Sequence, residues 1–217
     1  MVILYKVKNG CYFNLEDTFK EKEGTFNDNV YVNLTNRCSC ACTFCLRNTK
    51  EMQERNSLWL EREATVDEIK AEFDKYELSQ FNEIIFCGFG EPTMRLDDLL
   101  EVAKYLKTRD PKVKIRINSN GLANLVHKKQ VPPLFKGLID TISISLNAPT
   151  AEEYLELTRN NYGLESFNEM LNFAQDCKNY VPNVVLTVVD CIGKEKIAAS
   201  QAICDKIGIP LRVRPFE

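Results

Sequence analysis

The stretch VYVNLTNRCSCACTFC, residues 30–45, joins a short apolar run to four cysteines that fall within eight residues. Cys38, Cys42 and Cys45 form a C-x3-C-x2-C pattern directly after a predicted β-strand over residues 30–35. Three thiolates on one short loop can ligate three irons of a [4Fe–4S] cluster and leave the fourth iron without a protein ligand. The pattern therefore predicts an iron–sulfur site at the end of the first strand of the main domain.

Zinc and disulfides are the alternatives for these cysteines. A structural zinc site usually has four ligands in two separated pairs, but the chain has no second pair and its one histidine is His127. Nine cysteines is an odd number, and the chain is far longer than the small scaffolds that disulfides stabilise. We favour a cluster in a reducing compartment and keep zinc as the competitor. Cys40, inside the loop, is not needed as a ligand, and its role stays open.

Composition limits the classes of function. The chain has 217 residues, of which 44% are hydrophobic and 27% charged, and its formal net charge is −3. These values are typical of a globular protein and argue against a disordered chain or a broad nucleic-acid-binding surface. No segment approaches the roughly 20 apolar residues that span a membrane. The apolar residues 1–4 soon meet Lys6 and Lys8, so we expect no signal peptide, no membrane and a cytoplasmic location.

Short apolar segments alternate with amphipathic ones through most of the chain, which indicates parallel strands joined by helices. A closed barrel of eight such units takes about 250 residues, so we expect an α/β fold, a (β/α)6 partial TIM barrel. We assign residues 1–29 to an accessory hairpin and linker and residues 30–217 to the core domain, with no further domain after the sixth strand. The expected strands are Val30–Thr35, Glu83–Cys87, Val113–Asn118, Thr141–Leu146, Val184–Val189 and Leu211–Arg214.

Local signals mark turns and helix ends. Asn9-Gly10 predicts a hairpin turn between residues 3–7 and 11–14. Gly208 after Ile207, with Pro210 beyond it, predicts the end of the last helix. A Ser or Thr three residues before a Glu is the spacing of a capping box at a helix start. The pairs with this spacing are Thr65 with Glu68, Thr150 with Glu153 and Ser166 with Glu169.

Several ordered motifs resemble those of the radical S-adenosylmethionine (SAM) superfamily, and together they look like its small TatD-associated family. The cysteine loop carries Phe44 before its last cysteine, as is common in that superfamily. The similarity covers residues 30–217 in essence. The other segments that carry it are Trp59-Leu60-Glu61, Gly88-Phe89-Gly90-Glu91-Pro92-Thr93, Ile115–Gly121, Ser143–Pro149 and Arg212-Val213-Arg214-Pro215.

The resemblance implies two cofactors and a set of residues that bind them. Cys38, Cys42 and Cys45 would hold a [4Fe–4S] cluster, and SAM would chelate its open iron. Gly88, Gly90 and Glu91 match the motif whose backbone binds the methionine amino group, where the usual pattern is Gly-Gly-Glu-Pro and Phe89 departs from it. The positions that match contacts to the SAM ribose or carboxylate are Asn118, Asn120, Ser145 and Asn147.

The positions of these motifs support the assignment independently, because active sites of barrels built from β/α units lie at the carboxyl ends of the strands. Each motif follows one of the first four expected strands. Asp190 and Cys191 follow the fifth strand and Arg214 ends the sixth, and whether these residues face the site stays open. No catalytic residue is assigned.

The resemblance implies an enzyme that cleaves SAM reductively to a 5′-deoxyadenosyl radical, which abstracts hydrogen from an unidentified substrate. A reduced flavodoxin or ferredoxin-type protein would donate the electron, and the substrate could be a small molecule, a nucleic acid or a partner protein. One alternative is a glycyl-radical-enzyme activating protein. Another is a noncatalytic iron–sulfur protein, which would not cleave SAM. A methylase of the two-cysteine type ranks low, because Cys204 is its only late cysteine candidate and lies in a predicted helix.

Overall fold

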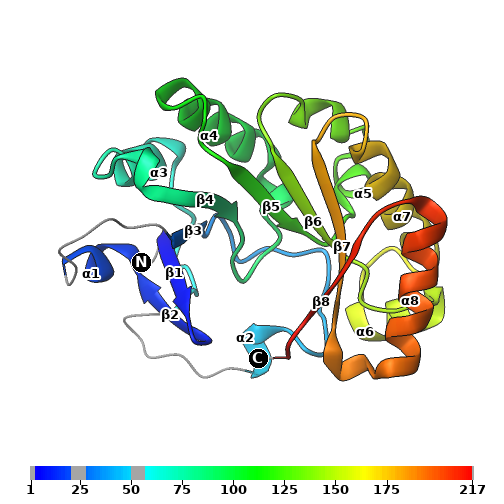
Figure 1. The fold of residues 1–217 in the computed structure, drawn as a ribbon. Coiled ribbons are helices and arrows are strands. Elements are labelled where there is room, and N and C mark those ends of the chain that lie inside the picture. Colours follow the sequence, from blue (N-terminus) through cyan, green and yellow to red (C-terminus); the bar gives the residue numbers. More distant parts are fainter. Residues whose placement is uncertain (1–2, 21–27, 50–56, 217) are drawn as a thin grey trace. The chain divides into compact units, whose positions relative to one another are not determined.

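The computed structural model describes residues 3–20, 28–49 and 57–216, and it divides into two compact units. The first unit holds the described residues of Met1–Arg37 and Glu51–Ile117, and the second those of Cys38–Lys50 and Asn118–Glu217. Strands and helices alternate along both units (Figure 1). The predicted α/β class with mostly parallel strands is confirmed.

The sheet of the first unit has the strand order β2-β1-β3-β4-β5. The hairpin of β1 and β2 is antiparallel, β1 also pairs antiparallel with β3, and β3, β4 and β5 are parallel. Asn9 (φ 51°) and Gly10 (φ 70°) are both left-handed, as a tight hairpin turn requires, so the predicted hairpin is present. The strands are β1 (Leu4–Lys8), β2 (Cys11–Asn14), β3 (Asp28–Val32), β4 (Phe81–Phe86) and β5 (Ile115–Ser119), whose last two residues belong to the second unit.

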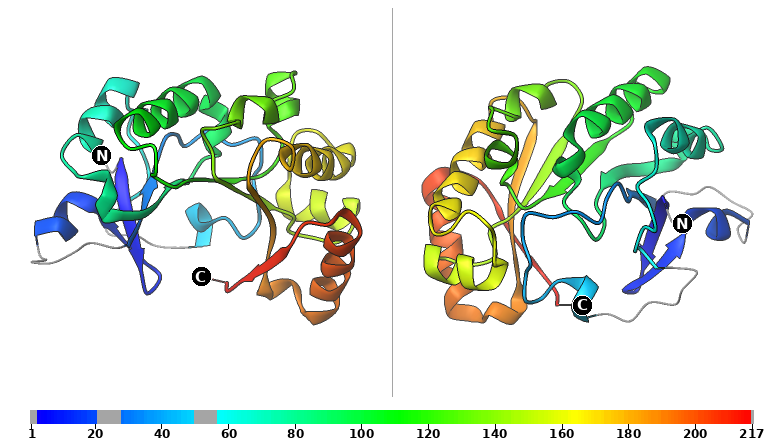
Figure 2. Two further views of the ribbon diagram at one scale, coloured as in Figure 1. Left: turned by 45° about the horizontal axis from the view of Figure 1, so that its top comes forward. Right: turned by 180° about the vertical axis from the view of Figure 1, so that it is seen from behind.

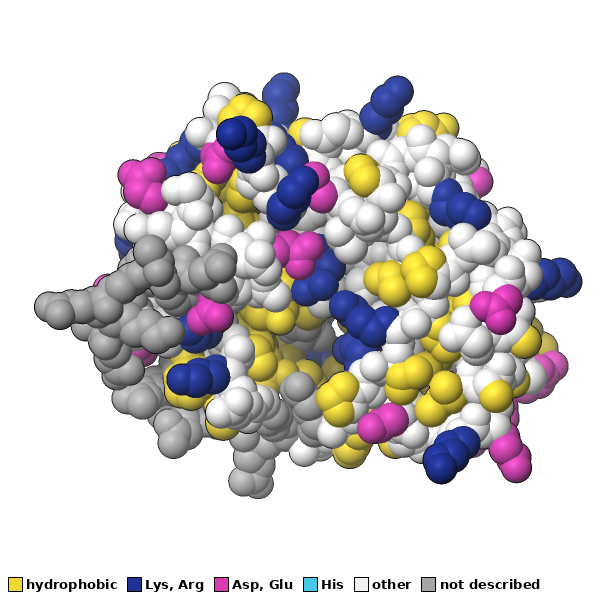
Figure 3. All heavy atoms as spheres, in the orientation of Figure 1, with side chains coloured by type: hydrophobic (Ala, Val, Ile, Leu, Met, Phe, Trp, Pro, Cys, Tyr) yellow, Lys and Arg dark blue, Asp and Glu magenta, His cyan; other side chains and the backbone are white. Residues whose placement is uncertain are grey.

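The helices of the first unit begin and end at recognisable signals. Thr65 accepts a hydrogen bond from the Glu68 amide and the Glu68 side chain accepts one from the Thr65 amide, which confirms the predicted capping box. On the face drawn in Figure 3, α3 and α4 carry acidic and basic side chains side by side. An ion pair of Lys70 with Glu101 joins the two helices. The helices are α1 (Leu15–Lys20), α3 (Val66–Phe73), α4 (Leu96–Arg109) and the 3₁₀ turns Leu78–Gln80 and Pro92–Arg95.

The second unit has a parallel sheet of β6, β7 and β8, with α6, α7 and α8 along one side (Figure 1; Figure 2). One side of the strands is apolar and buried, with Ile144 and Leu186 fully inaccessible, whereas Ser145, Thr187 and Arg212 stand in register on the other. The elements are α2 (Leu46–Thr49), α5 (Ala123–His127), the 3₁₀ turns Pro132–Phe135 and Asp190–Ile192, β6 (Thr141–Ser145), α6 (Ala151–Thr158), α7 (Glu165–Cys177), β7 (Asn183–Val189), α8 (Lys194–Ile207) and β8 (Leu211–Arg214).

The predicted capping box of Ser166 and Glu169 is wrong. Helix α7 begins at Glu165, and Ser166 lies inside it, fully buried. The Ser166 hydroxyl instead donates to the Gly163 carbonyl (2.6 Å) and accepts from the buried Asn160 amide (2.9 Å). A buried amide needs a partner, and this need outweighs the local capping preference.

The box of Thr150 and Glu153 is half formed. The Thr150 hydroxyl accepts from the Glu153 amide (3.2 Å), as predicted. The Glu153 carboxylate, however, forms an ion pair with Lys196 (2.8 Å), so helix α8 takes the group that the reciprocal bond would use. Helix α8 itself ends as predicted, with Gly208 in the left-handed conformation (φ 65°). No helix in the described ranges is long and apolar enough to cross a membrane.

Candidate functional site

The segment that leads to the cysteine loop is fixed by its own polar side chains. Strand β3 ends at Val32, before the predicted end at Thr35, because residues 33–37 bond to residues 58–63 instead. The side-chain amide of Asn33 donates to the Leu58 carbonyl (2.6 Å). The side-chain amide of Asn36 donates to the Leu60 carbonyl (2.7 Å) and accepts from the Leu60 backbone amide (3.1 Å). These short amides thus hold one stretch of irregular backbone against another.

Glu63 ties down the last residues of this segment. Its carboxylate accepts two hydrogen bonds from the Arg37 guanidinium (2.8 and 3.0 Å) and one from the Thr35 hydroxyl. Partial burial acts to raise the pKa of Glu63, but the bonds from Arg37 and Thr35 outweigh it and lower the pKa. Glu63 is therefore ionised at neutral pH and fixes the residue that precedes Cys38.

Arg95 is a second support that the sequence did not reveal. It is 9% exposed, and one guanidinium nitrogen donates to the carbonyls of Leu34 (2.9 Å) and Ala64 (2.8 Å). Its charge is balanced by Asp98 at 2.7 Å. A buried cation is found almost always where it is paired. A lone arginine in the turn before an amphipathic helix was the only available sequence signal.

The loop that follows β4 lies directly on this segment. A Cβ added to Gly88 would come within 2.2 Å of the Asn33 amide oxygen, and one added to Gly90 within 2.3 Å of the Thr35 carbonyl oxygen. At Gly90 the obstacle is backbone, so glycine is required there for close backbone approach, whereas at Gly88 the nearest neighbour is the Asn33 side chain. The Glu91 amide donates to the Arg37 carbonyl (2.8 Å). The first unit therefore brings together Gly88, Gly90 and Glu91 with the backbone that precedes Cys38.

The Glu91 carboxylate has a capping role in this structure. It is buried, and it accepts hydrogen bonds from the Thr93 amide (3.1 Å) and hydroxyl (2.7 Å) at the start of the 3₁₀ turn Pro92–Arg95. A contact from the loop backbone to SAM stays a prediction.

In the second unit the cysteine loop is anchored on the carboxyl end of helix α6. The Ala41 amide donates to the Thr158 carbonyl and the Thr43 amide to the Leu157 carbonyl, both at 2.9 Å. The last carbonyls of a helix have no partner within it and need an outside donor. The two bonds lie on either side of Cys42 and therefore fix its backbone.

Nitrogen donors surround the sulfur atoms of the loop. The Cys40 amide donates to Cys38 Sγ and the Arg47 Nε to Cys45 Sγ, each at 3.4 Å. Asn120 donates to Ser39 Oγ (3.0 Å), Cys40 Sγ (3.5 Å) and Cys38 Sγ (3.9 Å). Such donors stabilise negative charge on sulfur and tune iron–sulfur clusters.

The orientation of the Asn120 amide follows from its other bond. Its oxygen accepts from the Leu122 amide (3.0 Å), so its nitrogen must face the cysteine loop. Gly121 follows with φ 78°, and a Cβ there would lie 2.7 Å from Met170 Cγ. Asn120-Gly121 is therefore both a turn and a contact to the cysteine loop.

Cys40 is the buried member of the loop, 5% exposed. Hydrogen bonds of its thiol to Cys38 and Cys42, together with burial, raise the pKa of Cys40, and the bond from Cys40 lowers the pKa of Cys42. That Cys38, Cys42 and Cys45 are the cluster ligands stays a prediction.

The donor set fits a cluster held by three thiolates. Cys38, Cys42 and Cys45 are partly exposed thiols on one anchored loop, with nitrogen donors to Cys38 and Cys45. The described residues contain no group of three His, Cys, Asp or Glu side chains arranged around a single metal ion. A [4Fe–4S] cluster places each thiolate on a different iron, so its ligands need not converge on one point.

Two predicted contact residues present a buried acceptor. Among the described residues no partner contacts the side-chain oxygen of Asn118, on β5, or that of Asn147, which follows β6. Asn147 is left-handed (φ 64°), with its amide bonded to the Thr187 carbonyl (3.2 Å). A buried acceptor without a donor is costly, so a ligand with hydroxyl or amino groups fits here. Ser145 is half-buried at the end of β6.

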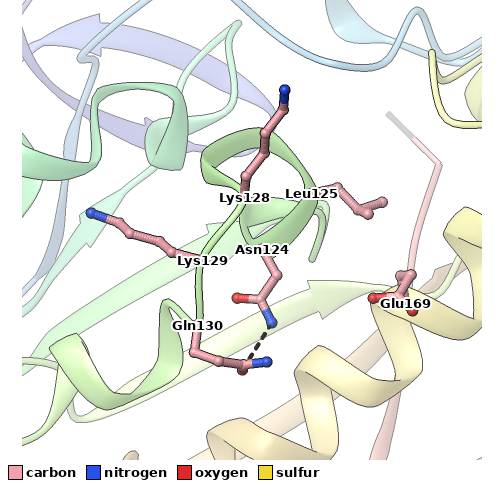
Figure 4. A pocket seen from close by; sticks show the side chains of 6 residues that line it. All are labelled: Asn124, Leu125, Lys128, Lys129, Gln130 and Glu169. Atoms are coloured by element: carbon pink, nitrogen blue, oxygen red, sulfur yellow. Dashed lines mark hydrogen bonds between the residues drawn. The ribbon is translucent and has the colours of Figure 1, made fainter.

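The remaining candidates are Asp190, Cys191 and Arg214. Asp190 is exposed and accepts from the Phe216 amide (3.0 Å), and Cys191 and Arg214 are exposed as well. Figure 4 shows a shallow surface pocket that contains none of the predicted site residues. Its lining is Asn124, Leu125, Lys128, Lys129, Gln130 and Glu169.

Comparison with known proteins agrees with the motifs. Residues 32–198 match the family model of the radical SAM superfamily. The chain is 31% identical over 148 residues to a GTP 3′,8-cyclase of Corynebacterium glutamicum, which covers 64% of this chain and 36% of that protein. It is 30% identical over 143 residues to a Methanocaldococcus jannaschii protein described as a glycyl-radical enzyme activating enzyme, covering 65% of this chain and 52% of the other.

Among solved structures, SuiB of Streptococcus suis bound to SAM matches 89% of this chain and 39% of its own, with a TM-score of 0.64 and 17% identity. This similarity confirms the fold, and the chain spans about a third to a half of the curated relatives described above. The chain belongs to the radical SAM superfamily, whose enzymes use a [4Fe–4S] cluster and SAM as cofactors.

Proposed function

We propose that this chain is a radical SAM enzyme whose cluster is held by Cys38, Cys42 and Cys45. The observation that carries the proposal is the cysteine loop, anchored by the α6 carbonyls and surrounded by nitrogen donors. When bound, the reduced cluster and SAM supply a 5′-deoxyadenosyl radical that abstracts hydrogen from a substrate. The chain itself contributes the binding and orientation of both cofactors.

The backbone of residues 88–90 is proposed to bind the methionine end of SAM. The two glycines leave no Cβ between this loop and its surroundings, and the Glu91 carboxylate keeps the loop in place through its cap on Thr93. The oxygens of Asn118 and Asn147 accept hydroxyl or amino donors of SAM. Ser145 and Asn120 complete the proposed set of SAM contacts. The side-chain amide of Asn120 lies beside the cysteines.

The wider assignments belong to the same proposal. From the order of the motifs we infer membership of the TatD-associated family. We also infer a core domain over residues 30–217, an accessory segment over residues 1–29 and a cytoplasmic location. A reduced flavodoxin or ferredoxin-type protein would supply the electron. The similarity to the M. jannaschii protein favours one second candidate, a glycyl-radical-enzyme activating protein, whose substrate would be a partner protein.

The test is anaerobic reconstitution with iron and sulfide, followed by dithionite reduction with SAM and quantification of 5′-deoxyadenosine. We expect about four irons per chain and release of 5′-deoxyadenosine in the native chain. Cys42→Ala should lose both. The matched control, Cys40→Ala in the same loop, should keep both, because Cys40 lies outside the proposed ligand set. Full activity in Cys42→Ala would contradict the proposal, and a cluster without SAM cleavage would favour a noncatalytic iron–sulfur protein.

A further inference from the structure

Phe89 is the residue that departs from the family's Gly-Gly-Glu-Pro pattern, and the structure supplies a reason for it. Phe89 packs against a small apolar cluster in the first unit, centred on the buried side chains of Tyr5 and Leu58. Val7, Tyr12 and Tyr31 pack against the same cluster. The aromatic ring therefore packs on a cluster to which the amino-terminal hairpin contributes Tyr5.

Tyr5 joins the hairpin to the same loop by a polar contact. Its ring is 2% exposed and stacks on Tyr31, with ring centres 5.1 Å apart. Its hydroxyl donates to the carbonyl of Cys87, the residue directly before Gly88, at 3.0 Å. A buried hydroxyl needs a partner, and this carbonyl supplies it. Tyr5 and Phe89 thus hold the loop at residues 87 and 89.

The hairpin is itself firmly placed within the first unit. Strand β1 pairs with β2 on one edge and with β3 on the other. The Ile3 carbonyl accepts a hydrogen bond from the backbone amide of Asn33, and the Asn33 side chain lies against Gly88. The hairpin therefore contacts both the loop over residues 87–91 and the segment on which that loop lies.

We propose that the amino-terminal hairpin is a support for the loop over residues 87–91, with Tyr5 and Phe89 as positioning residues for SAM. Tyr5 fixes the Cys87 carbonyl and Phe89 seats the loop on the hairpin, so the backbone of residues 88–90 is held in one conformation before SAM arrives. Preorganisation of this kind lowers the cost of binding. The inference rests on the proposed function, because it takes this loop as the site of the methionine end.

The first test is amide hydrogen exchange on the full chain without added SAM. The Cys87 amide bonds to Val32 and the Glu91 amide to Arg37 (3.1 and 2.8 Å), so their exchange reports local opening of the loop. Tyr5→Phe removes one hydrogen bond, so exchange should rise about 5-fold. Phe89→Gly removes the ring contact and should raise it about 10-fold, whereas Phe89→Leu, which keeps an apolar side chain, should stay near the native rate.

Two controls separate support from general loosening. Tyr12→Phe removes a hydroxyl from the same cluster but not the one bonded to Cys87, so loop exchange should not change. The amide of Leu146, in the second unit and bonded to the Thr187 carbonyl (2.9 Å), should exchange at the native rate in every variant. Native exchange of the loop in both Tyr5→Phe and Phe89→Gly, or equal acceleration of Leu146, would overturn the proposal.

The second test is calorimetric SAM binding to the reconstituted chain. The dissociation constant should rise about 5-fold in Tyr5→Phe and about 10-fold in Phe89→Gly, following the exchange results, with iron content unchanged. Phe89→Gly restores the family pattern. Family resemblance alone therefore predicts no loss of SAM affinity, whereas the proposal predicts a clear loss of affinity. Faster loop exchange with native affinity in both variants would overturn the proposal. A native chain that binds no SAM would refute the function, while exchange still reports on the hairpin's support of the loop.

Discussion

Replacing Gly90 with alanine tests how closely the loop after β4 lies on the segment before Cys38. An added Cβ would sit 2.3 Å from the Thr35 carbonyl oxygen and 2.5 Å from that of Arg37, whereas real Cβ contacts below 3.0 Å essentially do not occur. Both obstacles are backbone atoms, and Glu63 and Arg95 hold the segment in place. The loop must therefore move, because its neighbours cannot rotate away.

The size of the effect follows from two opposing terms. The φ angle of Gly90 lies outside the left-handed region, so alanine alone would stabilise the fold by about 0.4–1 kcal/mol through the unfolded chain. Overpacking costs about 1–3 kcal/mol, and two contacts with fixed backbone favour the upper end. The expected loss in the free energy of unfolding is about 2 kcal/mol, which lowers the melting temperature of a chain of this size by about 4–8 °C.

Thermal unfolding of the native chain, Gly90→Ala and Gly163→Ala measures this directly. Gly163 has φ 71° and open space around its Cβ position, so alanine there costs only backbone strain, about 1 kcal/mol. Gly163→Ala should therefore melt about 2–4 °C below the native chain and bind SAM normally, whereas Gly90→Ala should melt lower still and bind SAM more weakly. A Gly90→Ala protein as stable as the native chain would refute the steric argument.

Two further predictions concern charge and hydrogen bonding. Asn120→Ala removes an amide donor from Cys38 and Cys40. The midpoint potential of the reconstituted cluster, titrated by electron paramagnetic resonance, should therefore fall by about 40 mV, the equivalent of one hydrogen bond. An unchanged potential would contradict this role of Asn120. The second concerns Glu68. Hydrogen bonds from Arg62 and from the Thr65 amide lower the pKa of Glu68 to about 2. Because this pKa is depressed, ionised Glu68 stabilises the fold above its usual pKa near 4.5, and this stabilisation is lost as pH falls toward 2. Acid unfolding of Glu68→Gln should therefore lack that part of the pH dependence. Identical acid-unfolding curves for the native chain and Glu68→Gln would rule this effect out.

Sequence patterns located the strands within a few residues, because β/α repetition and turn residues are local signals. Asn9-Gly10 and Gly208 adopt the left-handed conformations that their residue types favour. The Ser166 prediction is wrong because a capping pattern says nothing about a buried amide such as Asn160 that competes for the same hydroxyl. Local spacing predicts local bonds, and tertiary partners then take some of those groups.

The site divides in the same way. The cysteine spacing predicts ligation, which stays a prediction. The glycine loop after β4 could also be recognised from sequence, because close backbone approach favours glycine. Arg95 was missed, because its carbonyl partners Leu34 and Ala64 are 61 and 31 residues away. The contact of Asn120 with Ser39 spans 81 residues, and no periodicity or motif predicts a bond over that separation.

Hydrogen bonding separates two groups of polar residues that sequence cannot tell apart. Asn36, Thr35 and Arg37 have the character of ligand-binding residues, yet their bonds go to Leu60 and Glu63 and hold the chain before Cys38. A buried acceptor without a donor is costly, so a fold retains one only where something else supplies the donor. The oxygens of Asn118 and Asn147 meet this condition among the described residues. They are therefore the side chains on which a SAM contact should be tested first, ahead of any polar residue that the scaffold already uses.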